Sequence, residues 1–298
     1  MGREESTHKR LRIGVNSPGP LKMKFKKNVL LRNYTTFRIG GPAKYFSVAK
    51  NKEELIEAIK LAKKLKLPFF ILGGGSNVLV SDKGFNGLVI KFGQLLSSYV
   101  SKGLEWAVGI PGTIQGAVCS NAGAFKKSMK DVVKEVEVFD IKTGKIKIFK
   151  NKDCKFSYRD SIFKHKKNLI ILSVRIKVKK SDPKKIKQYL DYRKKIQPLN
   201  LPSAGSVFKN PPGFSAGELG EEDKSSSSAF AAARLIEKCN LKGKKIGNVK
   251  ISEKHANFIV NLGRGKAKDV MKLIKIIKNR VKKKFGVTLE EEIQLLER

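Results

Sequence analysis

The sequence is poor in the residues that build metal sites and disulfide frameworks, and it has no long apolar run. Its three cysteines, Cys119, Cys154 and Cys239, are odd in number and far apart, and its three histidines do not cluster with them. This pattern fits reduced thiols and argues against both a disulfide framework and a zinc site. No apolar run approaches the ~18 residues of a membrane span, and the first residues are too polar for a secretory signal. We therefore expect a cytoplasmic protein, a monomer with neither a metal nor a membrane partner.

Acidic residues are also scarce. The chain has 64 lysines and arginines against 26 aspartates and glutamates, which gives a net charge of +38. Such a balance is typical of proteins that bind nucleic acid. Here, however, the lysines extend from Lys22 to Lys284 without concentrating in one element, which indicates solvated faces. We expect no specific nucleic-acid partner, although the positive field favours an anionic substrate.

The distribution of apolar residues indicates an α+β chain of about two domains. Residues 1–27 lack apolar periodicity and are interpreted as a disordered basic extension, and Pro198 and Pro202 mark a later domain boundary. The patterns predict helices over residues 53–66, 183–195, 229–239 and 269–284. They predict strands over residues 33–42, 45–49, 69–72, 78–80, 88–90, 136–139, 145–149, 169–178 and 258–261.

Two glycine-rich stretches are candidate phosphate-binding loops. The first, Gly73-Gly74-Gly75-Ser76-Asn77, follows the apolar residues 69–72, and its small residues allow backbone amides to turn toward an anion. It matches neither the P-loop nor the Rossmann fingerprint, and on its own it is as consistent with a plain turn. The second runs from Trp106 to Ala124 and is interpreted as another loop after a hydrophobic strand. Two such loops suit a long ligand such as a dinucleotide.

A third stretch, Pro202 to Pro211, combines small residues and prolines with three polar side chains, Ser206, Lys209 and Asn210. A hydroxyl beside a glycine can approach a substrate closely. Two other stretches offer partners: residues 156–161 contain Arg159, and residues 289–293 contain Glu292.

Taken together and in this order, these motifs resemble the UDP-N-acetylenolpyruvoylglucosamine reductase family. The resemblance extends from about residue 30 to the C-terminus and includes Asn33-Tyr34-Thr35-Thr36-Phe37 and Ser252 to Phe258. It implies an FAD-binding fold of the vanillyl-alcohol oxidase type in two subdomains, about residues 28–90 and 91–198. A C-terminal α+β substrate-binding domain would follow over residues 199–298. The direct passage from Pro198 to the Ser206 loop resembles the shorter subtype, which lacks a tyrosine-bearing loop.

The resemblance also implies a reaction and a set of residues. NADPH would reduce FAD, and the reduced flavin would pass a hydride to the enolpyruvyl group of the UDP-sugar, giving UDP-N-acetylmuramate. Ser206 would donate the proton, while Arg159 and a protonated Glu292 would polarise the substrate carboxylate; Lys209 would stabilise the resulting alkoxide. Tyr158, Lys209 and Asn210 would bind substrate. The residues expected to bind FAD are Gly73, Gly74, Gly75, Ser76, Asn77, Gly109, Gly112, Gly116, Asn121 and Gly123.

Structural alternatives exist for each of these side chains. Arg159 could form a surface ion pair with Asp160, Ser206 could hydrogen-bond its own loop, and Glu292 could belong to a solvated acidic run with Glu290 and Glu291. His255 is expected to hold a loop rather than to act in catalysis. Rival functions are a flavoprotein oxidase of the same fold, and a degenerate member that binds UDP-sugar or nucleic acid without turnover.

The sequence departs from the family pattern at three places. Residues 91–102 occupy the space where the family has a further strand and most of a helix, which could weaken cofactor binding or expose an edge strand. Residues 214–230 form an insert that contains four consecutive serines, 225–228. Gln115 stands where the family prefers glycine beside the flavin pyrophosphate, and its side chain could keep the backbone away from the phosphates.

Overall fold

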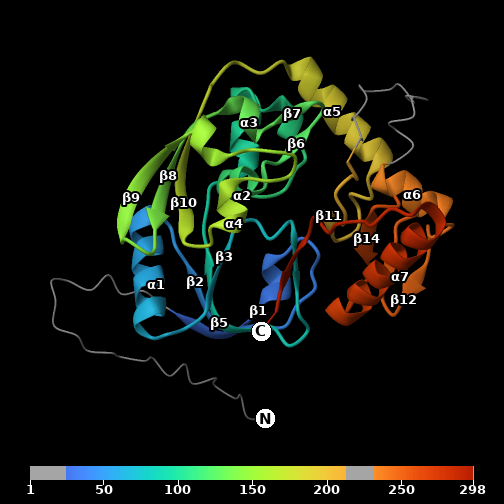
Figure 1. Cartoon of the computed structure of the whole chain (residues 1–298), viewed down its shortest axis with the longest axis horizontal. Coiled ribbons are helices and arrows are strands. Elements are labelled where there is room, and N and C mark those ends of the chain that lie inside the picture. Colours follow the sequence, from blue (N-terminus) through green and yellow to red (C-terminus); the bar gives the residue numbers. More distant parts are fainter. Residues whose placement is uncertain (1–24, 213–230, 298) are drawn as a thin grey trace, which may run out of the picture.

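A computed structural model of the chain describes residues 25–212 and 231–297 (Figure 1). Most of the predicted N-terminal extension and the whole 214–230 insert lie outside these ranges. The last residues of the predicted extension are part of strand β1 (Lys26–Leu30), so the boundary predicted after residue 27 is wrong. None of the helices in the described ranges is long and apolar enough to cross a membrane. In the same ranges no group of His, Cys, Asp and Glu side chains is arranged to hold a metal ion.

The first sheet is built from the N-terminal part of the chain. Its order is β1-β2-β5-β3, with β2 (Pro42–Val48), β5 (Phe85–Lys91) and β3 (Phe69–Leu72) parallel and β1 antiparallel to β2. Helix α1 (Lys52–Lys64) connects β2 to β3 and buries Leu55, Ile59 and Ala62. Asn51 starts this helix, because its side chain accepts a hydrogen bond from the Glu54 amide.

The second sheet contains three antiparallel strands in the order β10-β8-β9 (Figure 1). These are β8 (Val133–Asp140), β9 (Lys145–Lys150) and β10 (Leu169–Ile176). Helix α2 (Ile114–Ser120) packs against β10 and buries Ile114 and Val118. Smaller elements complete this part: β6 (Gly123–Ala124), β7 (Lys127–Ser128), α3 (Met129–Val132), α4 (Ile162–His165), and 3-10 turns at Leu96–Lys102, Glu105–Ala107 and Asn151–Cys154. Helix α5 (Pro183–Ile196) then leads toward the last third of the chain.

The last third forms a separate sheet with the order β11-β14-β13-β12. Its strands are β11 (Ser203–Ser206), β14 (Phe258–Asn261), β13 (Val249–Ile251) and β12 (Lys245–Ile246). Helices α6 (Ala232–Lys238) and α7 (Ala267–Phe285) pack on each other beside it (Figure 1). The apolar residues that predicted α7 are all buried: Val270, Leu273, Ile274, Ile277 and Val281.

The C-terminal strand returns to the first part of the molecule. Strand β15 (Gln294–Leu296) pairs in parallel with β4 (Val78–Val80), which directly follows the first glycine loop. Just before it, residues 290–292 pair with the chain that follows β11. The last residues therefore join the C-terminal sheet to the first subdomain.

Most predicted elements are confirmed, but two are wrong. Residues 33–42 do not form one strand: a 3-10 helix covers Leu31–Tyr34, and Arg38 has a φ of 53°. No strand precedes the second glycine loop; a 3-10 turn at Glu105–Ala107 stands there, and α2 follows it. The sequence pattern missed α2 because Gly109, Gly112 and Gly116 make this stretch glycine-dense, which is typical of a loop. Thr113 starts the helix by accepting a hydrogen bond from the Gly116 amide.

The short segment 91–102 is held by Gln115. Its side-chain oxygen accepts a hydrogen bond from the Gln94 amide (3.0 Å), and its side-chain nitrogen donates to the Leu172 carbonyl on β10 (3.3 Å). Gln115 is 8% exposed, so both contacts are shielded from water. The side chain ties the shortened connection to the second sheet, and β10 remains an edge strand of that sheet, as predicted.

Candidate active site

A large cavity lies where the three regions of the described chain meet. It has a volume of about 2370 Å³, more than twice the ~1,000 Å³ of a large single-ligand pocket. Both glycine loops, the end of β11 and Glu292 line it. A cavity of this size has room for a dinucleotide and a second nucleotide-sized ligand together.

The glycines of the two loops are required by the close approach of the loops themselves. A Cβ atom on Gly73 would lie 2.6 Å from the Thr113 hydroxyl, and one on Gly74 would lie 2.4 Å from the Cα of Gly112. Gly75 has a φ of 66°, and a Cβ there would lie 2.1 Å from the Tyr34 carbonyl. Real Cβ atoms do not approach so closely, so these positions accept only glycine.

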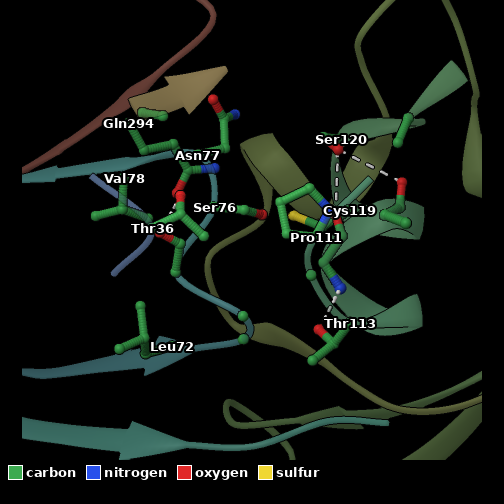
Figure 2. A pocket seen from close by; sticks show the side chains of 18 of the residues that line it. Thr36, Leu72, Ser76, Asn77, Val78, Pro111, Thr113, Cys119, Ser120 and Gln294 are labelled. Atoms are coloured by element: carbon green, nitrogen blue, oxygen red, sulfur yellow. Dashed lines mark hydrogen bonds between the residues drawn. The ribbon is translucent and has the colours of Figure 1, made fainter. Parts of the chain in front are cut away.

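The two loops lie against each other, and both line the cavity. Figure 2 shows Ser76 pointing from the first loop toward Pro111 and Cys119. All of the predicted cofactor residues except Asn121 line the cavity. The Asn77 side chain donates to the carbonyl of Glu292 at 3.0 Å, so one of its donors orients an active-site residue.

Asn121 lies beside the site rather than in its wall. It ends α2 with a φ of 44°, and its side-chain nitrogen donates to the Ser157 carbonyl at 2.7 Å. Its side-chain oxygen accepts from the Lys130 amide at 3.0 Å. Asn121 therefore supports the turn that carries Arg159.

Arg159 projects from a tight turn. The backbones of Ser157 and Asp160 hydrogen-bond to each other in both directions, and Arg159 between them has a φ of 53°. Lys164 donates to the Arg159 carbonyl (3.0 Å), and the His165 ring lies 2.7 Å from the Asp160 carboxylate. Asp160 is thus paired with His165, and the alternative of a surface ion pair between Arg159 and Asp160 is wrong.

Arg159 instead pairs with Glu292. Its Nε lies 3.0 Å from Glu292 Oε1, and the two side chains are only 24% and 18% exposed. The backbone amide of Glu292 donates to the Val207 carbonyl at 2.8 Å, so the backbone of Glu292 lies against the residue that follows Ser206. Glu290 and Glu291 pair with Lys209 and Lys278. Of this acidic run, Glu292 is the member that lines the cavity.

Ser206 ends β11 and lines the same cavity. Gly205 before it has a φ of 76°, which turns the chain toward the cavity. The hydrogen bond within this loop comes from Ser203, whose hydroxyl accepts from the Gly205 amide (3.4 Å). Within the described ranges the Ser206 hydroxyl has no hydrogen-bond partner, and it stays available for a ligand.

Sequence reasoning missed Arg193 on α5. This arginine is 7% exposed, lines the cavity, donates to the Trp106 carbonyl (3.1 Å) and lies over the ring of Phe125. Its Nε has no hydrogen-bond partner among the residues described. Burial, reinforced by the nearby charge of Arg159, lowers the pKa of Arg193 to about 10, so it remains charged at neutral pH. In the sequence it stands among lysines of a basic helix, and nothing distinguishes it from them.

The three residues predicted to bind substrate lie together outside the wall of the cavity. The Asn210 amide donates to the Tyr158 hydroxyl at 3.3 Å, and the Asn210 side chain accepts from the Ala232 amide at the start of α6. Lys209 forms its ion pair with Glu290 at 2.5 Å. His255 packs edge-on against Phe258, and burial lowers its pKa to about 4, so the ring is neutral. This fits the structural role expected of His255.

Two backbone loops at van der Waals distance, a large cavity and a buried Arg–Glu pair define a dinucleotide-dependent enzyme acting on an anionic substrate. The comparisons with known proteins identify it further. Residues 43–101 match the FAD binding domain family, and residues 197–296 match the C-terminal domain of UDP-N-acetylenolpyruvoylglucosamine reductase. The chain belongs to the UDP-N-acetylenolpyruvoylglucosamine reductase family.

Relatives of that name align over nearly the whole chain. The protein of Caldanaerobacter subterraneus is 40% identical, with 90% of this chain and 92% of the relative covered. The protein of Caldicellulosiruptor saccharolyticus is 42% identical over 93% of each. The crystal structure of the enzyme from Thermus caldophilus superposes with a TM-score of 0.73 at 33% identity, covering 92% of this chain and 100% of that one. The short 91–102 segment therefore does not remove the chain from the family.

The residues present fit FAD. The two loops line the same cavity and offer backbone amides and the Ser76 hydroxyl, which are donors suited to a diphosphate. Gln115 lines the cavity, and both polar groups of its side chain are hydrogen-bonded to Gln94 and Leu172; its expected effect on the approach of the phosphates stays a prediction.

Replacing Gly74 tests whether the contact between the loops holds the cofactor. In Gly74→Ala the new methyl group would meet Gly112 at 2.4 Å and push the loops apart. We expect the purified variant to lose most of its flavin. Flavin content is measured as the absorbance of the flavin's visible band divided by the ultraviolet absorbance of the protein's aromatic residues. Gly144→Ala is the control: its φ of 69° also strains the backbone, but its Cβ has no neighbour within 4 Å. Equal flavin content in both variants would contradict the assignment.

Proposed function

We propose that Arg159, Ser206 and Glu292 form the centre at which this chain reduces the enolpyruvyl group of UDP-N-acetylenolpyruvoylglucosamine to UDP-N-acetylmuramate, a step of peptidoglycan precursor synthesis. The supporting observation is the convergence of the three side chains. Arg159 and Glu292 are 3.0 Å apart, and Glu292 is hydrogen-bonded to the residue that follows Ser206. This convergence argues against a degenerate binding protein, which would not need to keep it.

The cofactors of the family are FAD and NADPH. When bound, the flavin supplies the hydride that NADPH has delivered to it, and the protein provides binding, orientation and charge. We propose that the backbone amides of the two glycine loops and the hydroxyl of Ser76 bind its diphosphate. Both loops line the same cavity (Figure 2).

Arg159 and Glu292 polarise the substrate carboxylate. The Arg159 guanidinium is a planar donor suited to two-point binding of a carboxylate. In this structure Glu292 approaches only its Nε (3.0 Å), and that Nε has no hydrogen-bond partner among the described residues. A substrate carboxylate that displaces Glu292 brings two carboxyl groups close together, and like charges at this distance favour protonation of one of them. Protonated Glu292 then donates a hydrogen bond to the carboxylate as negative charge develops on it.

Ser206 delivers the proton to the carbon beside the carboxylate. Ser206 lines the cavity, its hydroxyl has no competing partner in the described ranges, and Gly205 before it has a positive φ. Because a serine hydroxyl is a weak acid, neighbouring cations must stabilise the alkoxide that remains. The buried charges of Arg159 and Arg193 supply that field. Lys209, to which the family resemblance assigns this role, forms an ion pair with Glu290 instead.

Arg193 also favours an anionic ligand. Arg159 and Arg193 both line the cavity, and Glu292 neutralises only Arg159, so a phosphate or carboxylate of the substrate would balance the charge of Arg193.

The contacts of Tyr158, Lys209 and Asn210 with substrate stay a prediction. We assign the chain to the shorter subtype, because residues 197–202 alone connect α5 to β11. We place the reaction in the cytoplasm, where the free thiols of its cysteines remain reduced.

Replacing the proton donor separates the two half-reactions. Ser206→Ala should leave flavin reduction by NADPH intact and slow reoxidation by the enolpyruvyl substrate by about 10²–10⁴-fold. Anaerobic stopped-flow absorbance measures both steps. The matched control is Ser203→Ala on the same strand, which should keep both rates within a few-fold. Equal losses in the two half-reactions of Ser206→Ala would contradict the role of Ser206.

The acidic run offers a similar comparison for Glu292. Glu292→Gln keeps the shape of the side chain but cannot transfer a proton, so we expect at least a tenfold slower second half-reaction with NADPH oxidation unchanged. Glu291→Gln, which breaks only the ion pair with Lys278, should react like the unmodified protein. Normal turnover by Glu292→Gln would contradict this role and favour the alternative that Glu292 is one member of a solvated acidic run.

A further inference from the structure

A second cavity lies between the first sheet and the C-terminal region, on the other side of the segment that contains Asn33, Thr35 and Arg38. Its volume is about 840 Å³, and it shares these three residues with the active-site cavity. One wall comes from residues 30–42 and the other from residues 264–266, with Asp82 between them. Arg159, Ser206 and Glu292 do not line this cavity.

Four cations and one carboxylate line it. Arg32 and Arg38 belong to the N-terminal wall, and Arg264 and Lys266 to the C-terminal wall. Asp82 does not neutralise them, because its two oxygens accept hydrogen bonds from the amides of Ala267 (2.8 Å) and Lys268 (3.0 Å) at the start of α7. Within the described ranges none of the four cations has an ion pair or a hydrogen bond from its side chain. Like charges thus face each other across a boundary between two parts of the protein.

A buried side chain fixes the two walls relative to each other. Asn261 is 3% exposed, and its side-chain nitrogen donates to the carbonyls of Phe37 (3.0 Å) and Arg38 (3.3 Å). Its side-chain oxygen accepts from the amides of Gly263 and Gly265, each at 2.9 Å. Arg38 and Arg264 both have a left-handed backbone, with φ values of 53° and 54°. Asn261 therefore holds both arginine-bearing loops at a fixed separation, which a general excess of surface lysine would not require.

We propose that this cavity is a binding site for a small polyphosphate anion, either inorganic or carried by a nucleotide, which bridges the first subdomain and the C-terminal domain. Arginine forms two-point hydrogen bonds with phosphate oxygens, and arginines on both walls can grip neighbouring phosphate groups. A multivalent anion replaces repulsion between the walls with attraction on both sides. A single phosphate would leave most of the 840 Å³ unfilled. The bound anion would fasten the C-terminal domain to the sheet beneath it.

Calorimetric titration of the FAD-loaded full chain with inorganic pyrophosphate tests the proposal. Saturating UDP is included to block the diphosphate site of the substrate, and ATP is titrated in parallel. We expect saturable binding that becomes about tenfold weaker or more in Arg38→Gln/Arg264→Gln, because each variant residue removes charge-assisted hydrogen bonds. The control, Lys184→Gln/Lys185→Gln on exposed positions of α5, removes the same charge and should bind within about twofold of the unmodified protein. Circular dichroism checks that both variants are folded, and Lys266→Gln provides a milder second variant.

The outcomes separate the possible sources of binding. Equal affinities for pyrophosphate and ATP would show that the site recognises only the polyphosphate group. Tighter binding of ATP would show that it also recognises the nucleoside. No saturable binding in the presence of UDP, or equal weakening in the α5 control, would each overturn the proposal. These results do not depend on turnover, so they leave the assignment of Ser206 untouched.

Discussion

The active site depends on how the last residues of the chain are held between two distant segments. The Glu292 amide donates to the Val207 carbonyl, and the Glu292 carbonyl accepts from the Asn77 side chain. The following strand, β15, continues along β4. These backbone contacts hold Glu292 against the residue that follows Ser206, with its carboxylate beside Arg159. The Arg159–Glu292 pair is more than three-quarters buried, so solvent screens it less than an exposed ion pair, whose typical contribution is only about 0–1 kcal/mol.

The sequence predicts individual elements and motifs better than it predicts their connections. Helix α7 follows from its apolar period, and the β8–β9 hairpin follows from its flanking strands and the Lys142-Thr143-Gly144 turn. The pairing of β15 with β4 could not be predicted, because parallel pairing across about 215 residues leaves no local signal. Arg193 was missed for a similar reason, since burial distinguishes it and composition does not. Asn121 and Asn210 belong to motifs of the family, yet their side chains hydrogen-bond to backbone groups: Asn121 to the turn at Ser157 and Asn210 to the start of α6. A motif residue can thus support a site without touching a ligand.

The distribution of charge explains why the strongly basic composition is compatible with an enzyme of this family. Most of the excess lysine is on the surface. Three arginines line the active-site cavity, and two of them, Arg159 and Arg193, are largely buried. Desolvated cations attract an anionic substrate more strongly than exposed ones, because water screens them less. β10 lies at the edge of the second sheet, and Gln115 ties the short 91–102 segment to it with one partly buried and one buried hydrogen bond. The cavity walls made by the glycine loops remain in contact.

The visible absorption spectrum of the purified protein, recorded without oxygen while NADPH and then substrate are added, tests the central claim most directly. The account predicts a flavin band that bleaches with NADPH and recovers when UDP-N-acetylenolpyruvoylglucosamine is supplied. That sequence would establish cofactor, reductant and substrate in one experiment. A protein that takes up no flavin when FAD is supplied, or a bleached band that the substrate does not restore, would contradict it.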